Sequence, residues 1–527
     1  MSVSPAYRIW FWLTRTTLRK VTSAVVALVL AGGITAGALS LDNSLNECGA
    51  GFYRGSAHEC IGVTDGSYDF FDGLPGAPAA ARQQMTAVLA DIRALNRQVT
   101  GQYATIALLL PMTSADTPPI ETVHAVEGAY LAQSWADSPA DPKGPRIRLL
   151  LANPGTDSDQ WQPVVDQLAG LTGAPGNLLA VTGISVSTGQ TQAEVGQLTS
   201  QHIPVAGGAI VADDLANSAG ADPYPGLARV EPTNSQEAQA LAKYLASQDI
   251  SKQSAVLVED VANFDDPAKR DLYNYTLARQ FQAATAFEPE QFSSLSANVT
   301  NDIADRVLSI CDQPSIRWVY FAGRQAYLTD FLNELHTGCQ TRPFTVVTGS
   351  AASHLVNDPG LNQADFAGPD RLTLDYVPIA APLTWTSPAD ARTYGFMTSW
   401  YQTRFAPAFT RAFQVSGAQL NRALADGQAM INYDAALTAI SAIQDATGGS
   451  VVMPSPSDVA QYWPTLKGSR TVQGATGLIC LDNLGNPYDK AIPVVQYSTS
   501  GVPQPAGDPI FLDGPPTGTN CQIAQGG

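Results

Sequence analysis

The sequence is poor in positive charge. It contains 29 lysines and arginines against 47 aspartates and glutamates, which gives a formal net charge of −18 at pH 7. A chain that binds nucleic acid needs a basic patch to contact phosphates, and no predicted helix or strand carries a basic stripe. The composition therefore argues against nucleic acid as a partner.

Histidine and cysteine are also scarce, and their spacing does not resemble that of a metal site. None of the six cysteines lies in a CxxC motif, and the histidines are scattered singly. We therefore expect no metal, and we interpret each histidine as a surface or helix residue. The histidines are His58, His124, His202, His336 and His354.

The common catalytic motifs are missing as well. The chain has no H-E-x-x-H, no P-loop and no glycine fingerprint followed by an acid, and the run from Gly183 to Ser187 does not complete a G-x-S-x-G elbow. Four acids, Glu259, Asp260, Asp265 and Asp266, follow a predicted strand and are interpreted as an exposed loop. We predict a protein that is not an enzyme and has no cofactor.

The six cysteines that are present fit an oxidising compartment outside the cytoplasm. The sequence leaves several pairings open, but the spacing favours local disulfides. The favoured pairs are Cys48 with Cys60, Cys311 with Cys339, and Cys480 with Cys521.

The N-terminus has the pattern of a membrane segment. Residues 1–20 contain four basic residues and no acid, and residues 21–41 carry no charge. At about 1.5 Å per residue, a helix of that length just spans a hydrocarbon core of roughly 30 Å. The positive-inside rule keeps residues 1–20 in the cytoplasm. We predict a single-pass anchor with the rest of the chain outside, and cleavage after Ala38 to give a secreted protein is the alternative.

Residues 42–102 are predicted to form a leader that holds the first disulfide, followed by a helix. The helix, at about 79–98, has apolar residues at helical spacing, so one face should pack on the domain that follows. That stripe consists of Met85, Val88, Leu89, Ile92, Leu95 and Val99.

From Tyr103 onwards, apolar strands alternate with helices, which is typical of doubly wound α/β sheets. A first run has strands at 103–110, 146–152, 178–182 and 202–206, with helices at 120–136 and 160–171 between the first three. A second has strands at 254–259, 317–322 and 344–348, with helices at 235–247, 270–284, 301–309 and 326–335. Residues 353–445 have mixed character, with a strand at 371–377. A long helix is expected at 427–446, two strands around a turn at 482–487, and a Pro/Gly-rich tail at 499–527.

The loop from Gly183 to Thr188 joins a predicted strand to an amphipathic helix. Its hydroxyls and the unpaired backbone N–H groups of the helix, capped by Ser187 or Thr188, meet at one point. Such a place suits a carboxylate or another small anion. The simpler interpretation is that the hydroxyls only cap the helix.

The order of several short motifs resembles type I extracellular solute-binding proteins of the leucine, isoleucine and valine branch. The resemblance covers about residues 103–498, and the leader from Glu59 to Tyr68 looks like an addition found in membrane-anchored bacterial members. The motifs are Ile106–Pro111, Gly183–Thr188, Ile203–Val205, Arg229–Pro232, Ala255–Asp260, Tyr433–Ala435 and the late GATGLICLDNLGNP.

The resemblance implies two α/β lobes that are joined by several crossing strands and close over a small polar ligand. Lobe one would comprise 103–232 and 353–450, and lobe two 233–352 and 451–498. Ser185, Ser187 and Thr188 would receive the ligand's carboxylate, helped by the backbone of Gly208 and Ala209. The other contacts implied are Tyr273, Gln325 and Ser350.

One departure from the family concerns the partner of a ligand ammonium group. Amino-acid-binding members place an acid after the strand equivalent to 344–348, whereas this chain has Gly349-Ser-Ala-Ala. An ammonium group closed in without a charged partner would be costly, and Arg324 nearby could favour an acidic ligand. The resemblance thus implies presentation of an amino-acid-like or other polar solute to an ABC-type permease. An anchored sensor or scaffold that acts through another membrane protein is the alternative.

Overall fold

The computed structural model describes residues 48–512 and 521, apart from positions 57, 73, 75, 115–116, 139–143, 247, 249, 340–341, 368–370, 387–394 and 449–451. The chain divides into two compact units, Met1–Cys60 and Ile61–Gly527. The described part of the first unit contains the short strand β1 (Phe52–Arg54) and the predicted disulfide between Cys48 and Cys60.

The second unit contains two large sheets, and the first has the strand order β2-β4-β3-β5-β6-β7. Neighbouring strands from β4 to β7 are parallel, and β2 is antiparallel to β4. The strands are almost completely buried because helices cover them, as the continuous apolar runs predicted. Their bounds are β2 (Cys60–Thr64), β3 (Tyr103–Leu109), β4 (Arg146–Asn153), β5 (Leu178–Gly183), β6 (Val205–Gly207) and β7 (Leu227–Arg229).

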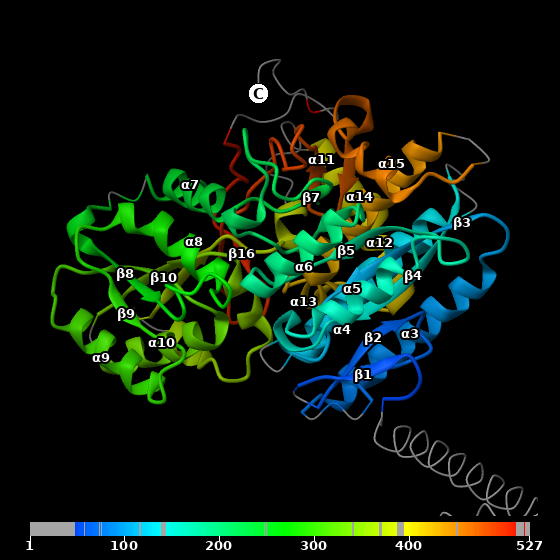
Figure 1. Cartoon of the computed structure of the whole chain (residues 1–527). Helices are drawn as coiled ribbons and strands as arrows, with labels where there is room; N and C mark the ends of the chain where they lie inside the picture. Colours follow the sequence, from blue (N-terminus) through cyan, green and yellow to red (C-terminus); the bar gives the residue numbers. More distant parts are fainter. Residues whose placement is uncertain are drawn as a thin grey trace, which may run out of the picture. The chain divides into compact units, whose positions relative to one another are not determined.

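The helices on this sheet complete what we call the first lobe (Figure 1). The long helix α14 (Gln428–Thr447) packs against α4 (Pro119–Ala136) and β5, although it lies some 300 residues after α4 in sequence. Gly128 permits this approach, since a Cβ atom there would lie 2.1 Å from the carbonyl oxygen of Ala429. The other helices are α3 (Ala79–Gln98), α5 (Trp161–Ala169) and α6 (Gly189–Ser200).

The second sheet, with its helices, forms the second lobe. Its order is β16-β15-β12-β11-β10-β8-β9, parallel from β12 to β9 with two antiparallel strands at the other edge. The strands are β8 (Ala255–Asp260), β9 (Glu290–Phe292), β10 (Trp318–Ala322), β11 (Thr345–Thr348), β12 (Thr373–Tyr376), β15 (Val495–Gln496) and β16 (Gln504–Pro505). The helices are α7 (Asn234–Leu245), α8 (Leu272–Phe281), α9 (Val299–Cys311) and α10 (Gln325–Gly338). Two doubly wound α/β lobes are therefore confirmed.

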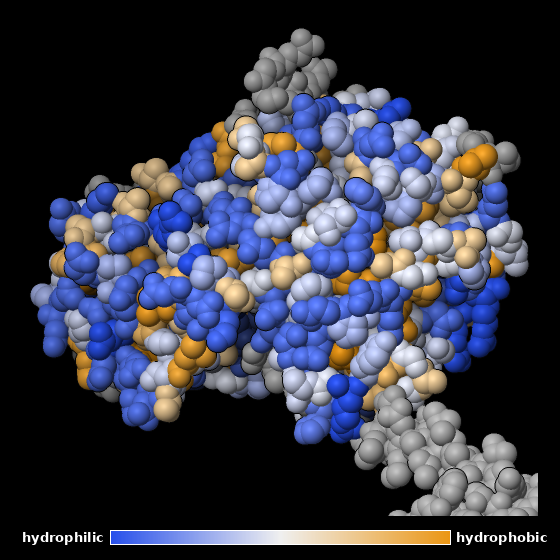
Figure 2. Space-filling view, viewed as in Figure 1, coloured by the Kyte–Doolittle hydropathy of each residue, from blue (hydrophilic) through white to orange (hydrophobic). Residues whose placement is uncertain are grey.

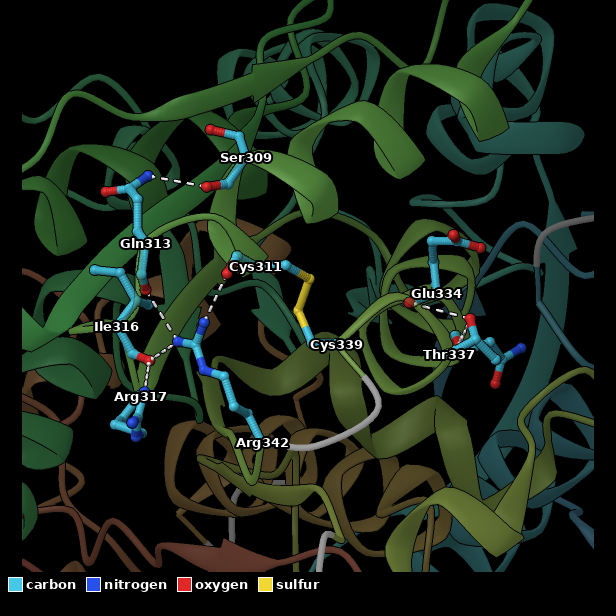
Figure 3. The surroundings of a disulfide bond; sticks show 10 residues. Ser309, Cys311, Gln313, Ile316, Arg317, Glu334, Thr337, Cys339 and Arg342 are labelled. Atoms are coloured by element: carbon cyan, nitrogen blue, oxygen red, sulfur yellow. Dashed lines mark hydrogen bonds between the residues drawn. A yellow bond between two sulfur atoms is a disulfide. The ribbon is translucent and has the colours of Figure 1, made fainter.

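A disulfide fastens α9 to α10 in the second lobe. Cys311 ends α9, Cys339 follows α10, and Figure 3 shows Arg342 reaching back beneath the bond. The guanidinium donates to the carbonyl oxygens of Cys311 at 2.9 Å and Gln313 at 3.0 Å, and also to that of Ile316. The third pair, Cys480 with Cys521, is also formed, so all three favoured pairings are confirmed.

The chain passes between the lobes three times. The crossings run from β7 to α7, from β12 towards α14, and from β14 (Gly477–Ile479) to β15. Residues of all three crossings line one small cavity, among them Glu231, Ile379 and Lys490. The lobes are thus connected by several strands of chain and not by a single linker.

The C-terminal segment has strands on both sides of the turn at 482–487, as predicted, but their partners lie elsewhere. The two expected strands on either side of the turn at 482–487 do not pair, because β14 pairs with β13 (Val472–Gly474) and β15 joins β12 in the second sheet. The turn itself is present, since the Asp482 carboxylate accepts from the backbone N–H groups of Leu484 and Asn486 at 2.8 and 2.9 Å. The free edge of β12 offers β15 a partner that the sequence did not reveal. The remaining helices are α11 (Gly395–Trp400), the π-helix η9 (Tyr401–Phe405), α12 (Ala406–Phe413), α13 (Ala418–Ala423) and α15 (Pro456–Ala460).

The surface in Figure 2 is mainly hydrophilic, with apolar residues in small separate groups. The large hydrophobic side chains most exposed among the described residues are Tyr53, Leu295, Leu308 and Val452. The predicted membrane segment, residues 21–41, lies outside the described residues. Within the part of the chain that the structure describes, no helix is both long and apolar enough to span a membrane.

Candidate ligand site

A cavity of about 340 Å³ lies between the two lobes. This volume is within the range of roughly 300–1,000 Å³ that is typical of sites for small molecules. The first lobe contributes Pro111, Ser114, Thr117, Glu121, Asp157, Ser185, Val186 and Thr188 to its wall. The second contributes Asp260, Asp271, Ser294, Arg324, Gln325, Tyr327, Ala351 and His354.

The wall is built at the carboxyl ends of parallel strands from both sheets. Pro111 follows β3, Ser185 follows β5, Asp260 ends β8, Arg324 follows β10 and Ala351 follows β11. Loops at this edge of an open α/β sheet are where ligands bind, because neighbouring connections there diverge to opposite faces. The topology of both lobes therefore directs polar side chains to one place.

The predicted hydroxyl loop forms one wall of the cavity. Thr188, and not Ser187, is the N-cap of α6, and its Oγ1 accepts from the backbone N–H of Thr191 at 3.2 Å. Ser185 and Thr188 both line the cavity. Ile184 holds a left-handed conformation with φ of 57°, which turns the chain sharply out of β5. The loop thus places two hydroxyls and the N-terminus of a helix at the cavity.

The same loop is bonded directly to the second lobe. The carbonyl oxygen of Ser187 accepts from the backbone N–H of Tyr273 at 3.1 Å and from Nη2 of Arg324 at 3.2 Å. Gly189 donates its N–H to the carbonyl oxygen of Arg270 at 3.0 Å, and Thr188 forms a β-bridge with Asp271. The lobes are therefore joined next to the cavity as well as at the three crossings.

Arg324 lines the cavity with its charge already balanced. Its Nε lies 2.6 Å from Oδ2 of Asp271, and its Nη2 donates to Oδ1 at 3.0 Å. The guanidinium carbon also lies 4.9 Å from the centre of the Tyr273 ring. Burial lowers the pKa of Arg324, but the Asp271 carboxylate more than offsets this and raises it. A bidentate pair of this kind leaves Arg324 little capacity to attract an anionic ligand.

Comparison with known proteins shows the fold. No protein-family model matches the chain, and no curated protein matches it. Among solved structures, a leucine-binding protein from Thermotoga maritima has a TM-score of 0.56 at 16% identity, covering 78% of this chain and 99% of that one. The ABC transporter substrate-binding protein from Desulfitobacterium hafniense, in complex with Leu, has a TM-score of 0.54 at 16% identity, covering 77% of this chain and all of that one. A branched-chain amino acid ABC transporter protein from Thermus thermophilus, with bound valine, has a TM-score of 0.53 at 12% identity, covering 78% and 97%.

The fold is that of a type I periplasmic binding protein. In this type I fold, three of the residues predicted as ligand contacts, Ser185, Thr188 and Gln325, line the cavity between the lobes. The amide of Gln325 donates to the carboxylate of Asp358 and, at 3.4 Å, to Oγ1 of Thr329. These three residues come from opposite lobes and meet at one cavity.

The other residues predicted as ligand contacts lie behind the wall of the cavity. Ser187 is buried, and its Oγ accepts from the backbone N–H groups of Val211 and Ala212 at 3.2 and 3.3 Å. Gly208 donates its N–H to the carbonyl oxygen of Gly183 at 2.5 Å, and Ala209 is buried beside it. Both segments therefore brace the hydroxyl loop from behind.

Tyr273 and Ser350 of the second lobe are buried as well and do not line the cavity. The Tyr273 hydroxyl accepts from the backbone N–H of Ala351 at 3.1 Å, and burial raises the pKa of that hydroxyl. The tyrosine thereby positions the loop after β11, whose Ala351 does reach the cavity. Its ring also lies against Arg324, as described above.

The sequence did not predict that several acids lie at the cavity. The interpretation of Glu259 and Asp260 as an exposed loop was wrong, because both are buried at the end of β8. Asp260 lines the cavity and accepts from the N–H groups of Ser294 at 2.9 Å and Ala262 at 3.1 Å. Asp157 lines the opposite wall. Carboxylates therefore face the cavity from both lobes, although none follows β11.

Glu121 and His354 are a second pair that the sequence did not indicate. Glu121 lies in the first turn of α4, and His354 lies in the 3-10 helix η5 (Ser350–Asn357) that follows β11. Nδ1 of His354 bonds to the Glu121 carboxylate, and both residues line the cavity. Because 233 positions separate them in sequence, only the folded chain brings them together.

Proposed function

We propose that this protein is an extracellular solute-binding protein that closes its lobes over a small polar ligand and presents it to an ABC-type importer. The observation that carries the proposal is the polar cavity of about 340 Å³ lined by residues of both lobes. When the two lobes close, the ligand would be buried between the carboxyl ends of strands from both sheets. The solved structures described above support the proposal, since they include an ABC transporter substrate-binding protein in complex with Leu and a leucine-binding protein.

We propose that Ser185 and Thr188 bind a carboxylate or similar acceptor group on the ligand and that Gln325 contacts it from the second lobe. Ser187, Gly208, Ala209, Tyr273 and Ser350 would hold the loops that make these contacts. The carboxylates of Asp157 and Asp260 supply negative charge that the Gly349-Ser-Ala-Ala loop lacks. An amino-acid-like ligand, with one anionic and one cationic group, would match this distribution.

The proposed location is the outer face of the cell membrane. Three disulfides suit an oxidising compartment, and residues 21–41 would anchor the chain, with cleavage after Ala38 as the alternative. An anchored protein would meet its permease by lateral diffusion in the membrane. The same arrangement would serve a sensor or scaffold that reports closure to another membrane protein.

The decisive experiment is a thermal-shift screen of the purified protein against amino acids, small peptides, sugars and nucleobases. A ligand at a hundred times its Kd stabilises the folded state by about 2.7 kcal/mol, so a true ligand should raise the melting temperature in a concentration-dependent way. The shift should disappear in the variant S185A/T188V and persist in S455A, which alters a hydroxyl cap on α15. A folded protein that responds to no solute would favour the scaffold role.

A further inference from the structure

A polar cluster crosses from one lobe to the other at the edge of the ligand cavity. It contains two histidines, two carboxylates and one amide: His124, Glu121, His354, Asn357 and Asp426. Glu121 and His124 lie on α4, and Asp426 lies just before α14, so these three belong to the first lobe. His354 and Asn357 lie on η5, whose Leu355 is part of the core of the second lobe.

The hydrogen bonds in this cluster are specific in direction. The Asn357 amide donates one hydrogen to Oε1 of Glu121 at 3.1 Å and the other to Oδ2 of Asp426 at 2.9 Å. Nδ1 of His354 faces Oε2 of Glu121, and Nδ1 of His124 lies 2.6 Å from Oδ2 of Asp426. Each carboxylate thus bonds to one imidazole and to one hydrogen of the Asn357 amide, which links the two carboxylates. Asp426 also accepts from the backbone N–H of Gln428 at 3.0 Å.

The pKa values of Glu121 and His354 are both raised where the two lobes meet. His354 has a side chain about a quarter exposed, whereas the Glu121 carboxyl is fully buried. Burial and the nearby Arg324 both lower the pKa of His354. The carboxylates of Glu121 and Asp426 raise it by more, so the pKa of His354 is raised overall. Burial is also the main reason that the pKa of Glu121 is raised, against the effect of His354. If the lobes separate, the hydrogen bond between Glu121 and His354 breaks and both side chains become hydrated.

We propose that Glu121 and His354 form a proton-dependent latch between the lobes, so that closure over the ligand takes up a proton. This inference rests on the proposed function, because it assumes that the lobes open and close. The ligand itself is not part of the latch, and the latch would act on the empty protein as well.

The sign of the pH effect follows from the higher pKa of His354 in the closed form. Where the closed form binds a proton that the open form has lost, lowering the pH favours closure. The benefit is complete below the pKa of a free histidine, about 6.5, and is lost as the pH rises through the raised value. His124 stays beside Asp426 within the first lobe in both forms, so it changes little on opening.

The test measures the distance between the lobes in the ligand-free protein. Spin labels at D166C on α5 and L308C on α9, both exposed positions, report the populations of open and closed forms by pulsed electron resonance. We expect the ratio of closed to open protein to fall by about tenfold between pH 6 and pH 9, because closure at the higher pH no longer takes up a proton.

Two variants and one control identify the groups responsible. E121Q and H354N should each remove most of the pH dependence, and the two changes combined should do no more than either alone. H202N replaces an exposed histidine of the first lobe and should behave like the wild type. A ratio that does not change with pH, or an E121Q protein that keeps the wild-type pH dependence, would overturn the latch. Ligand binding in the thermal-shift screen would still stand in that case, so the two proposals fail separately.

Discussion

Arg324 and Asp271 form a bidentate ion pair at the edge of the cavity, with Nε and Oδ2 2.6 Å apart. The pair also touches the other lobe, because Nη2 of Arg324 donates to the carbonyl oxygen of Ser187. Arg324 therefore serves the contact between the lobes and is not a free cation that awaits an acidic ligand. This changes the ligand expected from the sequence, where Arg324 suggested an anion.

Replacing Asp271 should convert Arg324 into such a free cation. In D271N we expect the free energy of unfolding to fall by about 1–3 kcal/mol, since a partly buried charge loses its partner. Binding of dicarboxylates in thermal-shift assays should become stronger at the same time. The exposed pair of Lys269 and Asp266, 3.7 Å apart, gives a control, because D266N should alter neither property by more than about 0.5 kcal/mol.

Thr188 has two separate roles, as the N-cap of α6 and as part of the cavity wall. T188A should cost about 1 kcal/mol of stability through the lost cap and should also weaken ligand binding, whereas T188S should keep both. S455A removes the capping side chain of α15, which accepts from the N–H of Asp458 at 3.2 Å. That variant should lose stability without loss of affinity. Equal affinity of T188A and wild type would refute a binding role for the hydroxyl.

Glu194 on α6 should make the first lobe less stable in alkaline solution. Burial raises its pKa to about 8, against a hydrogen bond from Ser158, and its Oε1 has no hydrogen-bond partner among the described residues. Because the folded pKa exceeds the unfolded one, its contribution is complete below about pH 4.5 and is lost as the pH rises through 8.

In urea titrations, E194Q should therefore match the wild type near pH 4.5 and exceed it by roughly 2–4 kcal/mol near pH 8.5. The exposed acid Asp166 offers the comparison, and D166N should follow the wild type at both pH values. A constant difference between E194Q and wild type across the pH range would mean that Glu194 is ionised when folded.

Two glycines in the helices of the first lobe should respond to alanine in opposite directions. At Gly128 a Cβ atom would meet the carbonyl oxygen of Ala429 at 2.1 Å, so G128A should push α4 from α14 and cost about 1–3 kcal/mol. At Gly196 on α6 nothing lies within 4 Å, so G196A should add about 0.5–1 kcal/mol through helix propensity. Denaturant unfolding of both variants checks the pair, and a stable G128A would show that the two helices can separate freely.

The sequence predicted most strands and helices of the two lobes because their signals are local, but the segment 353–377, expected in lobe one, contains β12 of the second sheet. Continuous apolar runs such as Tyr103–Leu109 mark strands covered on both faces, and the helices between them keep their apolar periodicity. The three disulfides join cysteines that are 12, 28 and 41 positions apart, so short separation was a useful guide. The cap of α6 was also recognisable, as one of two candidate hydroxyls.

The cavity residues that the sequence suggested are Ser185 and Thr188 in one loop and Gln325 in the second lobe. Ser185 and Thr188 lie together in sequence, whereas Glu121 and His354 meet across the lobes and carry no common motif. Burial was misjudged for Glu259 and Asp260 because a charged pair after a strand is usually exposed, and here neighbouring loops cover it. Both tail strands lie where the sequence predicted them, but the sequence did not indicate that β15 pairs with the edge of β12.

The sequence alone determined the order of strands and helices and the composition of the hydroxyl loop, and it favoured the cysteine pairs that form, since each depends on neighbours along the chain. The tertiary structure decided which charges face the cavity, that Asp271 neutralises Arg324, and that η5 contacts α4. Those properties arise where the two lobes pack against each other. A contact between residues hundreds of positions apart produces no periodic pattern in the sequence.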